Sequence, residues 1–145
     1  MERAEMVVRV LLAAQALLAA GIDVRVRRLP NALAATFAMT AACGALCSGG
    51  PGALARNAAC AVLACAALIA FELFWRRGHG GAPGIGMGDV KFLFGAMLLG
   101  PLWALLSFAL GMVALAFAGL IGRVRALPAL PLIVGAMAVL AIWQW

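Results

Sequence analysis

The chain has 145 residues, of which 67% are hydrophobic and only 11% are charged. Soluble domains carry roughly 25% charged residues, so this composition excludes an ordinary soluble protein. The formal net charge of +6 comes mostly from arginines in links between apolar segments. We therefore interpret it as a signal of membrane orientation, with no nucleic acid as partner. We expect an all-α polytopic protein of the lipid bilayer, with one domain over residues 1–145.

Apolar stretches separated by basic or Gly/Pro-containing links predict about six transmembrane helices. They cover residues 6–22, 30–47, 57–75, 89–99, 101–121 and 128–145. A turn over residues 48–52 separates the second and third segments. The fourth segment is short because Gly100 and Pro101 interrupt the apolar stretch.

The short fourth segment has a consequence for depth. A helix over residues 89–99 is about 16 Å long, whereas the hydrocarbon core is about 30 Å thick. If its far end reaches one surface, its first residue lies inside the membrane. We therefore expect the glycine-rich loop 84–88 to enter the membrane beside Asp89, buried in protein or lining a wet cavity.

The arginines are distributed unevenly between the two sides of this topology. Three links, residues 24–29, 76–88 and 122–127, fall on one side. That side holds seven arginines and the other side holds Arg3, Arg9 and Arg56; the seven are Arg25, Arg27, Arg28, Arg76, Arg77, Arg123 and Arg125. The positive-inside rule then places these links in the cytoplasm and both termini outside, in a cell inner membrane.

Asp23 and Asp89 are the candidate catalytic residues. Asp23 ends the first segment and Asp89 begins the fourth, so both lie at the cytoplasmic side. Ionisable residues at membrane depth are costly, and they therefore indicate function. Two carboxylates brought together in a low-dielectric site share one proton, and such a pair can split water across a peptide bond.

The residues around the two aspartates have mechanical roles in this hypothesis. Gly86 and Gly88 allow the backbone to approach a substrate strand closely. Pro30 suits the first turn of the second helix. Lys91 lies on the opposite side of its helix from Asp89, so we expect it to extend toward the headgroups.

Two further features have ordinary structural explanations. Glu72 and Arg76 are four residues apart near the end of the third segment, which predicts a helix-end ion pair. The four cysteines lie in apolar segments without a Cys-x-x-Cys pair, so we expect no metal site.

Two motifs resemble those of the prepilin peptidases, which are GxGD intramembrane aspartyl proteases. Asp23 is followed by Arg28-Leu29-Pro30-Asn31, and the glycine loop reads Gly86-Met87-Gly88-Asp89-Val90-Lys91. The later stretch Pro128-Ala129-Leu130-Pro131 matches, locally, a motif of presenilins and signal peptide peptidases. The resemblance implies a catalytic pair, Asp23 and Asp89, with a site lined by Pro30, Asn31, Gly86, Gly88, Lys91, Pro128 and Pro131.

The resemblance also implies a substrate. Prepilins or pseudopilins, which carry a basic leader before an apolar helix, would be cut on the cytoplasmic side after a glycine. The chain lacks the cysteine-bearing insert of large family members and looks like the short members that serve tight-adherence (Flp) pili or archaeal-type flagellins. We therefore expect no cofactor and place no methyltransferase site.

Two other functions are compatible with paired membrane carboxylates. In a membrane scaffold the aspartates would cap helices, which suits Asp89 at a helix start but not Asp23 at a helix end. In a proton-coupled carrier they would relay protons. The sequence contains no inverted repeat that would favour a carrier.

Overall fold

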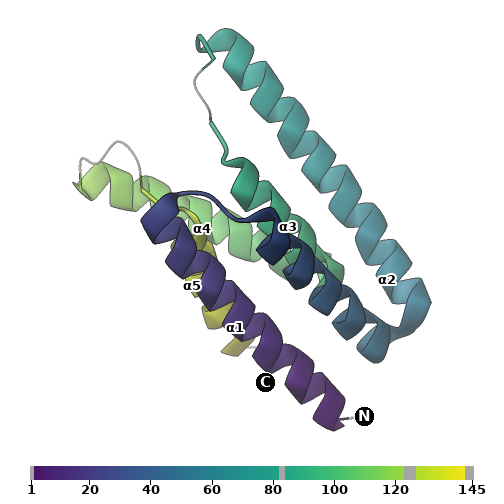
Figure 1. Cartoon of the computed structure of the whole chain (residues 1–145). Helices are drawn as coiled ribbons and strands as arrows, with labels where there is room; N and C mark the ends of the chain where they lie inside the picture. The colour runs from purple at the N-terminus through teal and green to yellow at the C-terminus, as the bar shows by residue number, and fades with distance from the viewer. Residues whose placement is uncertain (1, 82–83, 123–126, 143–145) are drawn as a thin grey trace.

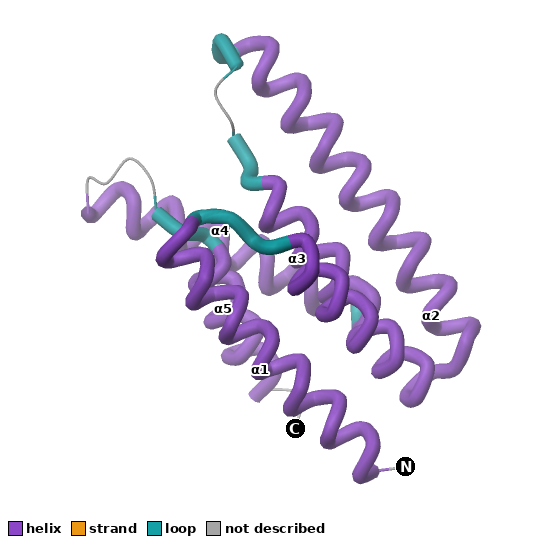
Figure 2. Tube along the Cα trace, viewed as in Figure 1, coloured by secondary structure: helices purple, strands orange, loops and turns teal. Residues whose placement is uncertain are grey.

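The computed structural model describes residues 2–81, 84–122 and 127–142, and this part of the chain is helical without strands (Figures 1 and 2). Its helices are α1 (Glu2–Val26), α2 (Asn31–Gly78), α3 (Met87–Leu99), α4 (Pro101–Gly122) and α5 (Leu130–Ile142). The prediction of an all-α fold is confirmed.

α2 is bent sharply into two arms. Gly50 has a φ of 69° and a ψ of −175°, a conformation that favours glycine, and Pro51, which has no N–H, follows it. Figure 1 shows the chain reversing direction at this point. We call residues 31–49 the first arm and residues 51–78 the second arm. They correspond to the second and third predicted segments, and the bend lies in the predicted turn.

The other predicted segments have counterparts with shifted ends. α1 continues to Val26, beyond the predicted end at residue 22, and the short fourth segment is α3. The sixth is α5, which begins at Leu130 and not at residue 128. Residues 143–145 of that segment lie outside the described residues, as do Arg123 and Arg125 of the orientation argument.

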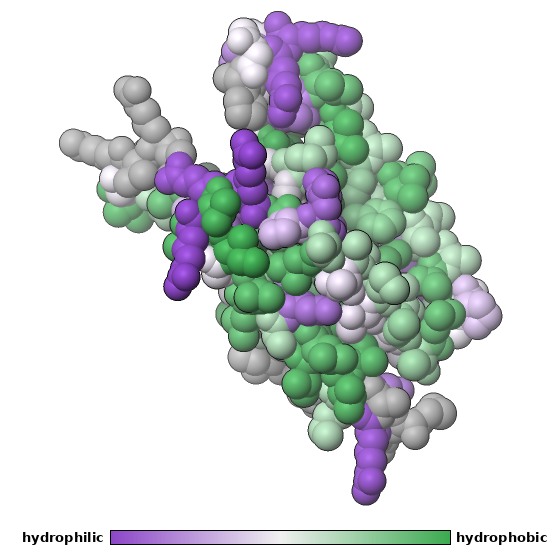
Figure 3. Space-filling model, in the orientation of Figure 1, coloured by the Kyte–Doolittle hydropathy of each residue, from purple (hydrophilic) through white to green (hydrophobic). Residues whose placement is uncertain are grey.

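The surface and the helix lengths are those of a membrane protein. The helical stretches Glu5–Val26, Asn31–Gly78 and Pro101–Gly122 are long and apolar enough to cross a bilayer. Figure 3 shows a broad apolar surface, with hydrophilic residues gathered mainly toward the ends of the bundle. The two arms of α2 are about 28 Å and about 42 Å long, against a hydrocarbon core of about 30 Å. The count of about six crossings stays a prediction.

α3 is the central helix of the fold. Its buried residues lie on all sides of the helix, as expected for a helix enclosed by others: Val90, Phe92, Leu93, Gly95, Ala96, Met97 and Leu98. Against the first arm, the rings of Phe37 and Phe92 stack with centroids 4.7 Å apart. Gly95 permits this approach, because a Cβ there would lie 2.6 Å from the Phe37 ring.

The second arm of α2 runs antiparallel to α3 on another side. Asn57 Nδ2 donates a hydrogen bond to the carbonyl of Leu98 at 3.0 Å, and Cys65 Sγ donates one to the carbonyl of Val90 at 3.7 Å. The Asn57 bond satisfies a carbonyl in the last turn of α3, where an α-helix leaves such groups unpaired. The second arm therefore holds α3 by its backbone as well as by apolar packing.

α4 and α5 complete the bundle through a close approach. A Cβ at Gly111 would lie 2.7 Å from Cα of Ile133, so the two helices meet there almost backbone to backbone. α5 also packs on α1. This arrangement brings the start of α5 to the end of α1, where the candidate catalytic residues lie.

Candidate active site

A cavity of about 650 Å³ lies where α1 ends and where α3 and α5 begin. Of the nine predicted site residues, seven line it: Asp23, Asn31, Gly86, Gly88, Asp89, Lys91 and Pro128. Pro30 lies between the lining residues Leu29 and Asn31, and Pro131 lies two residues after the lining residue Ala129, but neither proline is part of the lining. Segments distant in sequence therefore converge on one cavity.

Asp23 lies in the last turn of α1 and is buried, with 8% of its surface exposed. Its Oδ2 accepts a hydrogen bond from the backbone N–H of Leu130 at 3.2 Å. Leu130 is the first residue of α5, and N–H groups at a helix start have no partner within the helix. Asp23 thus caps α5, and the bond fixes the orientation of its carboxylate.

Asp89 lies in the first turn of α3, three residues after the N-cap Gly86. Its backbone N–H donates to the Gly86 carbonyl at 3.0 Å. A Cβ at Gly86 would lie only 2.8 Å from Oδ2 of Asp89, so the missing side chain leaves the space that this carboxylate occupies. Gly86 itself has a φ of −68° and a ψ of 130°, which any residue can adopt.

The two carboxylates line one cavity, and like charges brought together in a low-dielectric site disfavour joint ionisation. They come from different helices and face the same cavity. Asp23 is held by the start of α5 and Asp89 by the loop before α3, so each is positioned by a different structural element.

The two sequence motifs are in direct contact. A Cβ at Gly88 would lie 3.3 Å from Cβ of Leu29 and 3.4 Å from its backbone nitrogen, so Gly88 allows the two segments to pack closely. Lys91 Nζ also donates a hydrogen bond to Asn31 Oδ1 at 2.7 Å. The sequence placed Lys91 away from Asp89, but it gave no sign of Asn31 as its partner.

The family of the chain follows from comparison with known proteins. The sequence profile of the type IV leader peptidase family matches residues 10–142. The chain belongs to the type IV leader peptidase family. No curated protein and no solved structure matches it. The matched range includes both motifs, and the resemblance to prepilin peptidases is confirmed.

In this leader peptidase family member, Glu72 has more partners than the sequence suggested. The predicted ion pair with Arg76 is confirmed, with Nε and Oε1 2.6 Å apart. The Glu72 carboxylate also accepts hydrogen bonds from the backbone N–H groups of Gly84 and Ile85. Sequence reasoning missed these contacts because they join a helix to a loop of irregular backbone.

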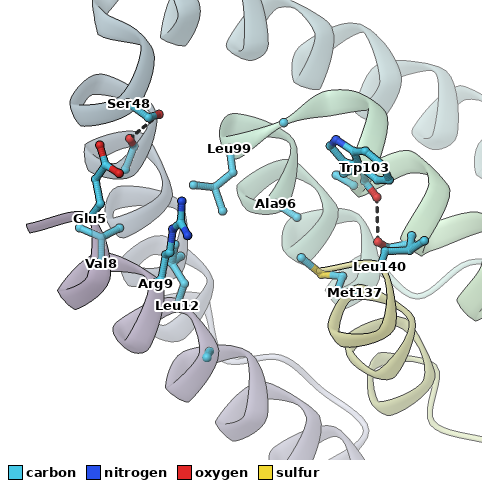
Figure 4. Close-up of a pocket in the computed structure, with 15 residues that line it drawn as sticks. Glu5, Val8, Arg9, Leu12, Ser48, Ala96, Leu99, Trp103, Met137 and Leu140 are labelled. Carbon is cyan, nitrogen blue, oxygen red and sulfur yellow. Dashed lines mark hydrogen bonds between the residues drawn. The ribbon is translucent and has the colours of Figure 1, made fainter. Parts of the chain in front are cut away.

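A second cavity of about 470 Å³ lies between α1, the first arm and the junction of α3 with α4 (Figure 4). Its lining is mostly apolar, and the labelled side chains include Glu5 and Arg9 of α1 with Leu99, Trp103 and Met137. Glu5 is the sole acid among the described residues that line it. Of the two cavities, the one lined by Asp23 and Asp89 is therefore the one that brings two acids together.

Proposed function

We propose that this chain is a membrane aspartyl endopeptidase that removes the basic leader of prepilins or pseudopilins. Membership of the type IV leader peptidase family supports a leader peptidase role in general. The observation that carries the finer proposal is the convergence of Asp23 and Asp89 on one cavity.

The proposed reaction uses the two carboxylates with one shared proton. One carboxylate takes a proton from a water molecule, whose oxygen attacks the scissile carbonyl, while the other carboxylic acid protonates the carbonyl oxygen. The tetrahedral intermediate then collapses. The acid that took the proton from water gives it to the nitrogen, the other carboxylate recovers its proton from a hydroxyl of the intermediate, and the C–N bond breaks to leave a carboxylic acid and an amine. A carboxylate fixed by Leu130 and another placed against Gly86 supply the orientation that such a reaction requires.

The surrounding residues would receive the substrate. Gly86 and Gly88 line the cavity beside Asp89, where an extended strand of the substrate would lie. The Asn31–Lys91 pair and Pro128 provide other walls of the cavity. Pro30 and Pro131 stand at the starts of α2 and α5, where proline suits the helix start and sets the direction of the helices beside the cavity.

The second arm of α2 supports an active site below the membrane surface. Cys65 contacts Val90, and Arg76 lies eleven residues further along this arm, which corresponds to about 16 Å. If Arg76 and Arg77 mark the headgroup level, Asp89 and the loop before α3 lie within the bilayer. We propose about six crossings of the inner membrane, with the basic links and the site facing the cytoplasm and both termini outside.

The proposed substrate is a small protein with a basic leader, a glycine and an apolar helix. The chain is proposed to act, without a cofactor, as the short form does in tight-adherence pilus systems. The scissile bond would have to leave its helix before water can attack it, and the glycine loop is the segment beside which it would unwind.

The alternative function, a membrane scaffold, explains the position of each aspartate when each is considered by itself. Asp23 caps α5, and Asp89 stands in the first turn of α3, where a carboxylate interacts favourably with the helix dipole. Neither role requires both carboxylates to face one cavity, so convergence favours the peptidase. No contact among the described residues favours a proton-coupled carrier over these two.

Co-expression with a candidate prepilin tests the proposal. The wild type is expected to remove the leader, detected as a mobility shift on a gel, while Asp23→Asn and Asp89→Asn each abolish it. Glu5→Gln, which changes the acid of the second cavity, serves as the control and is expected to cleave normally. Unchanged processing in either aspartate variant, at equal amounts of membrane-inserted protein, would contradict the proposal. Proton flux without cleavage would indicate a carrier.

A further inference from the structure

Glu72 is a buried acid outside the cavity of the two aspartates. It is one of only five acidic residues in the chain, and 4% of its surface is exposed. The ion pair with Arg76 explains how the negative charge of Glu72 is compensated. It does not explain why Glu72 is buried, because an ion pair at a helix end can form at the surface. The other contacts of this carboxylate explain its position.

The Glu72 carboxylate holds the backbone that leads into α3. Oε2 accepts hydrogen bonds from the N–H of Gly84 at 3.0 Å and from the N–H of Ile85 at 2.7 Å. Hydrogen bonds to an ionised acceptor are shorter and stronger than neutral ones. Gly84 fits tightly against the same arm, because a Cβ there would lie 3.0 Å from the Trp75 ring and 3.1 Å from Glu72.

The held segment directly precedes Asp89. Gly86 follows Ile85. The Gly86 carbonyl accepts hydrogen bonds from the backbone N–H groups of Asp89 at 3.0 Å and Val90 at 3.3 Å. The Asp89 carboxylate also lies against the Cα of Gly86, where a Cβ would be 2.8 Å from Oδ2. A shift of residues 84 and 85 would therefore move both the start of α3 and the wall against which Asp89 rests.

Glu72 also belongs to a series of polar contacts along one face of the second arm. Asn57, Cys65 and Glu72 are seven or eight residues apart, a spacing that keeps them on one side of a helix. Asn57 binds the end of α3, Cys65 binds its beginning, and Glu72 binds the loop before it. Side chains of the second arm thus form hydrogen bonds with the backbone at both ends of α3.

We propose that Glu72 is a positioning residue of the active site, which fixes residues 84 and 85 and thereby sets the place of Asp89. The catalytic consequence rests on the proposed peptidase function, whereas the structural consequence does not. The competing explanation is that Glu72 serves only as the partner of Arg76 in a helix-end ion pair.

Hydrogen–deuterium exchange of the full-length protein in detergent micelles separates these explanations. Glu72→Ala removes the acceptor of both loop amides, whereas Arg76→Gln breaks the ion pair and leaves the acceptor in place. We expect exchange in peptides covering residues 84–90 to accelerate about tenfold or more in Glu72→Ala and to change less than about twofold in Arg76→Gln. Equal behaviour of the two variants would overturn the proposal.

Kinetics with a purified prepilin give a second readout. A displaced Asp89 should lower kcat by about tenfold or more while KM stays within about twofold, because substrate binding surfaces are retained. Glu72→Gln, which keeps one acceptor oxygen, is expected to fall between Glu72→Ala and the wild type. A wild-type kcat for Glu72→Ala would overturn the proposal.

Gly84→Ala keeps the test decisive if Glu72→Ala does not accumulate. The new methyl group pushes on Trp75 and Glu72 from the loop side while the ion pair remains, so it should raise exchange over the same peptides. Unchanged exchange in Gly84→Ala would count against the proposal. Faster exchange in a protein that cleaves no prepilin would support the positioning contact and refute the peptidase function, so the two ideas fail separately.

Discussion

Replacement of Gly86 by alanine is expected to impair catalysis without harming the fold. A Cβ at this position would lie 2.8 Å from Oδ2 of Asp89, whereas ordinary contacts begin at 3.4 Å. The carboxylate oxygen must therefore move by about 0.6 Å. Alanine adopts the φ and ψ of Gly86 without strain, so the backbone has no reason to rearrange.

The size of the effect follows from this displacement. Turning Asp89 away from its preferred rotamer costs about 0.5–1.5 kcal/mol, so the free energy of unfolding should change by no more than this. Misplacement of a reacting group by about 1 Å can cost about 100-fold in rate. We expect kcat/KM for leader removal to fall between about 10-fold and 100-fold.

Kinetics of purified protein with a prepilin, together with thermal unfolding in the same detergent, measure both quantities. Gly21→Ala is the matched control, because it makes the same substitution two residues before Asp23 and its Cβ would meet nothing within 4 Å. Cleavage by Gly86→Ala at the wild-type rate would contradict a tight fit of Asp89 against Gly86. A loss of activity in Gly86→Ala that merely follows a loss of folded protein would contradict it as well.

Three further substitutions test the packing that positions the site. For each, the free energy of unfolding in detergent is measured. Asn57→Ala should destabilise the fold by about 1–3 kcal/mol by leaving a carbonyl at the end of α3 unpaired, and wild-type stability would argue against that contact. Gly111→Ala should cost about 1–3 kcal/mol, because the backbone of α5 cannot yield to the new Cβ. A neutral result would mean that α4 and α5 lie further apart. Phe37→Ala should cost about 3–5 kcal/mol, whereas Phe74→Ala, at an exposed position, should stay within about 0.5 kcal/mol. Similar losses at both phenylalanines would contradict the central position of α3.

The features predicted correctly from the sequence were those that local chemistry determines. Gly50 and Pro51 divide α2 because one adopts a positive φ and the other lacks an N–H. Gly100 and Pro101 end α3 and begin α4. These residues act on their own neighbours, so their effect can be predicted without the rest of the fold.

The helix ends were predicted less well. The first segment was expected to end at residue 22, where the apolar stretch stops, yet α1 continues to Val26. Backbone hydrogen bonding does not depend on hydropathy, and arginine is a good helix former. A boundary drawn from hydropathy therefore marks the apolar stretch and not the end of the helix.

The convergence of Asp23 and Asp89 was predicted from matching depth and from the two motifs. The contacts that position them were missed: the N–H of Leu130 on Asp23, and Glu72 on the loop before α3. Each joins a side chain to the backbone of a distant element, and such a contact leaves no periodic signal in the sequence. For Glu72, an ion pair with the nearby Arg76 was a sufficient local explanation, so its hydrogen bonds to the loop were not predicted.

The rate of leader removal by a double aspartate variant is the most direct measurement of whether the two carboxylates work as one unit. Asp23→Asn, Asp89→Asn and the double variant should all be reduced to the same residual rate, because the loss of either acid disables the pair. Losses that multiply in the double variant, or a single variant that keeps most of the wild-type rate, would contradict the account.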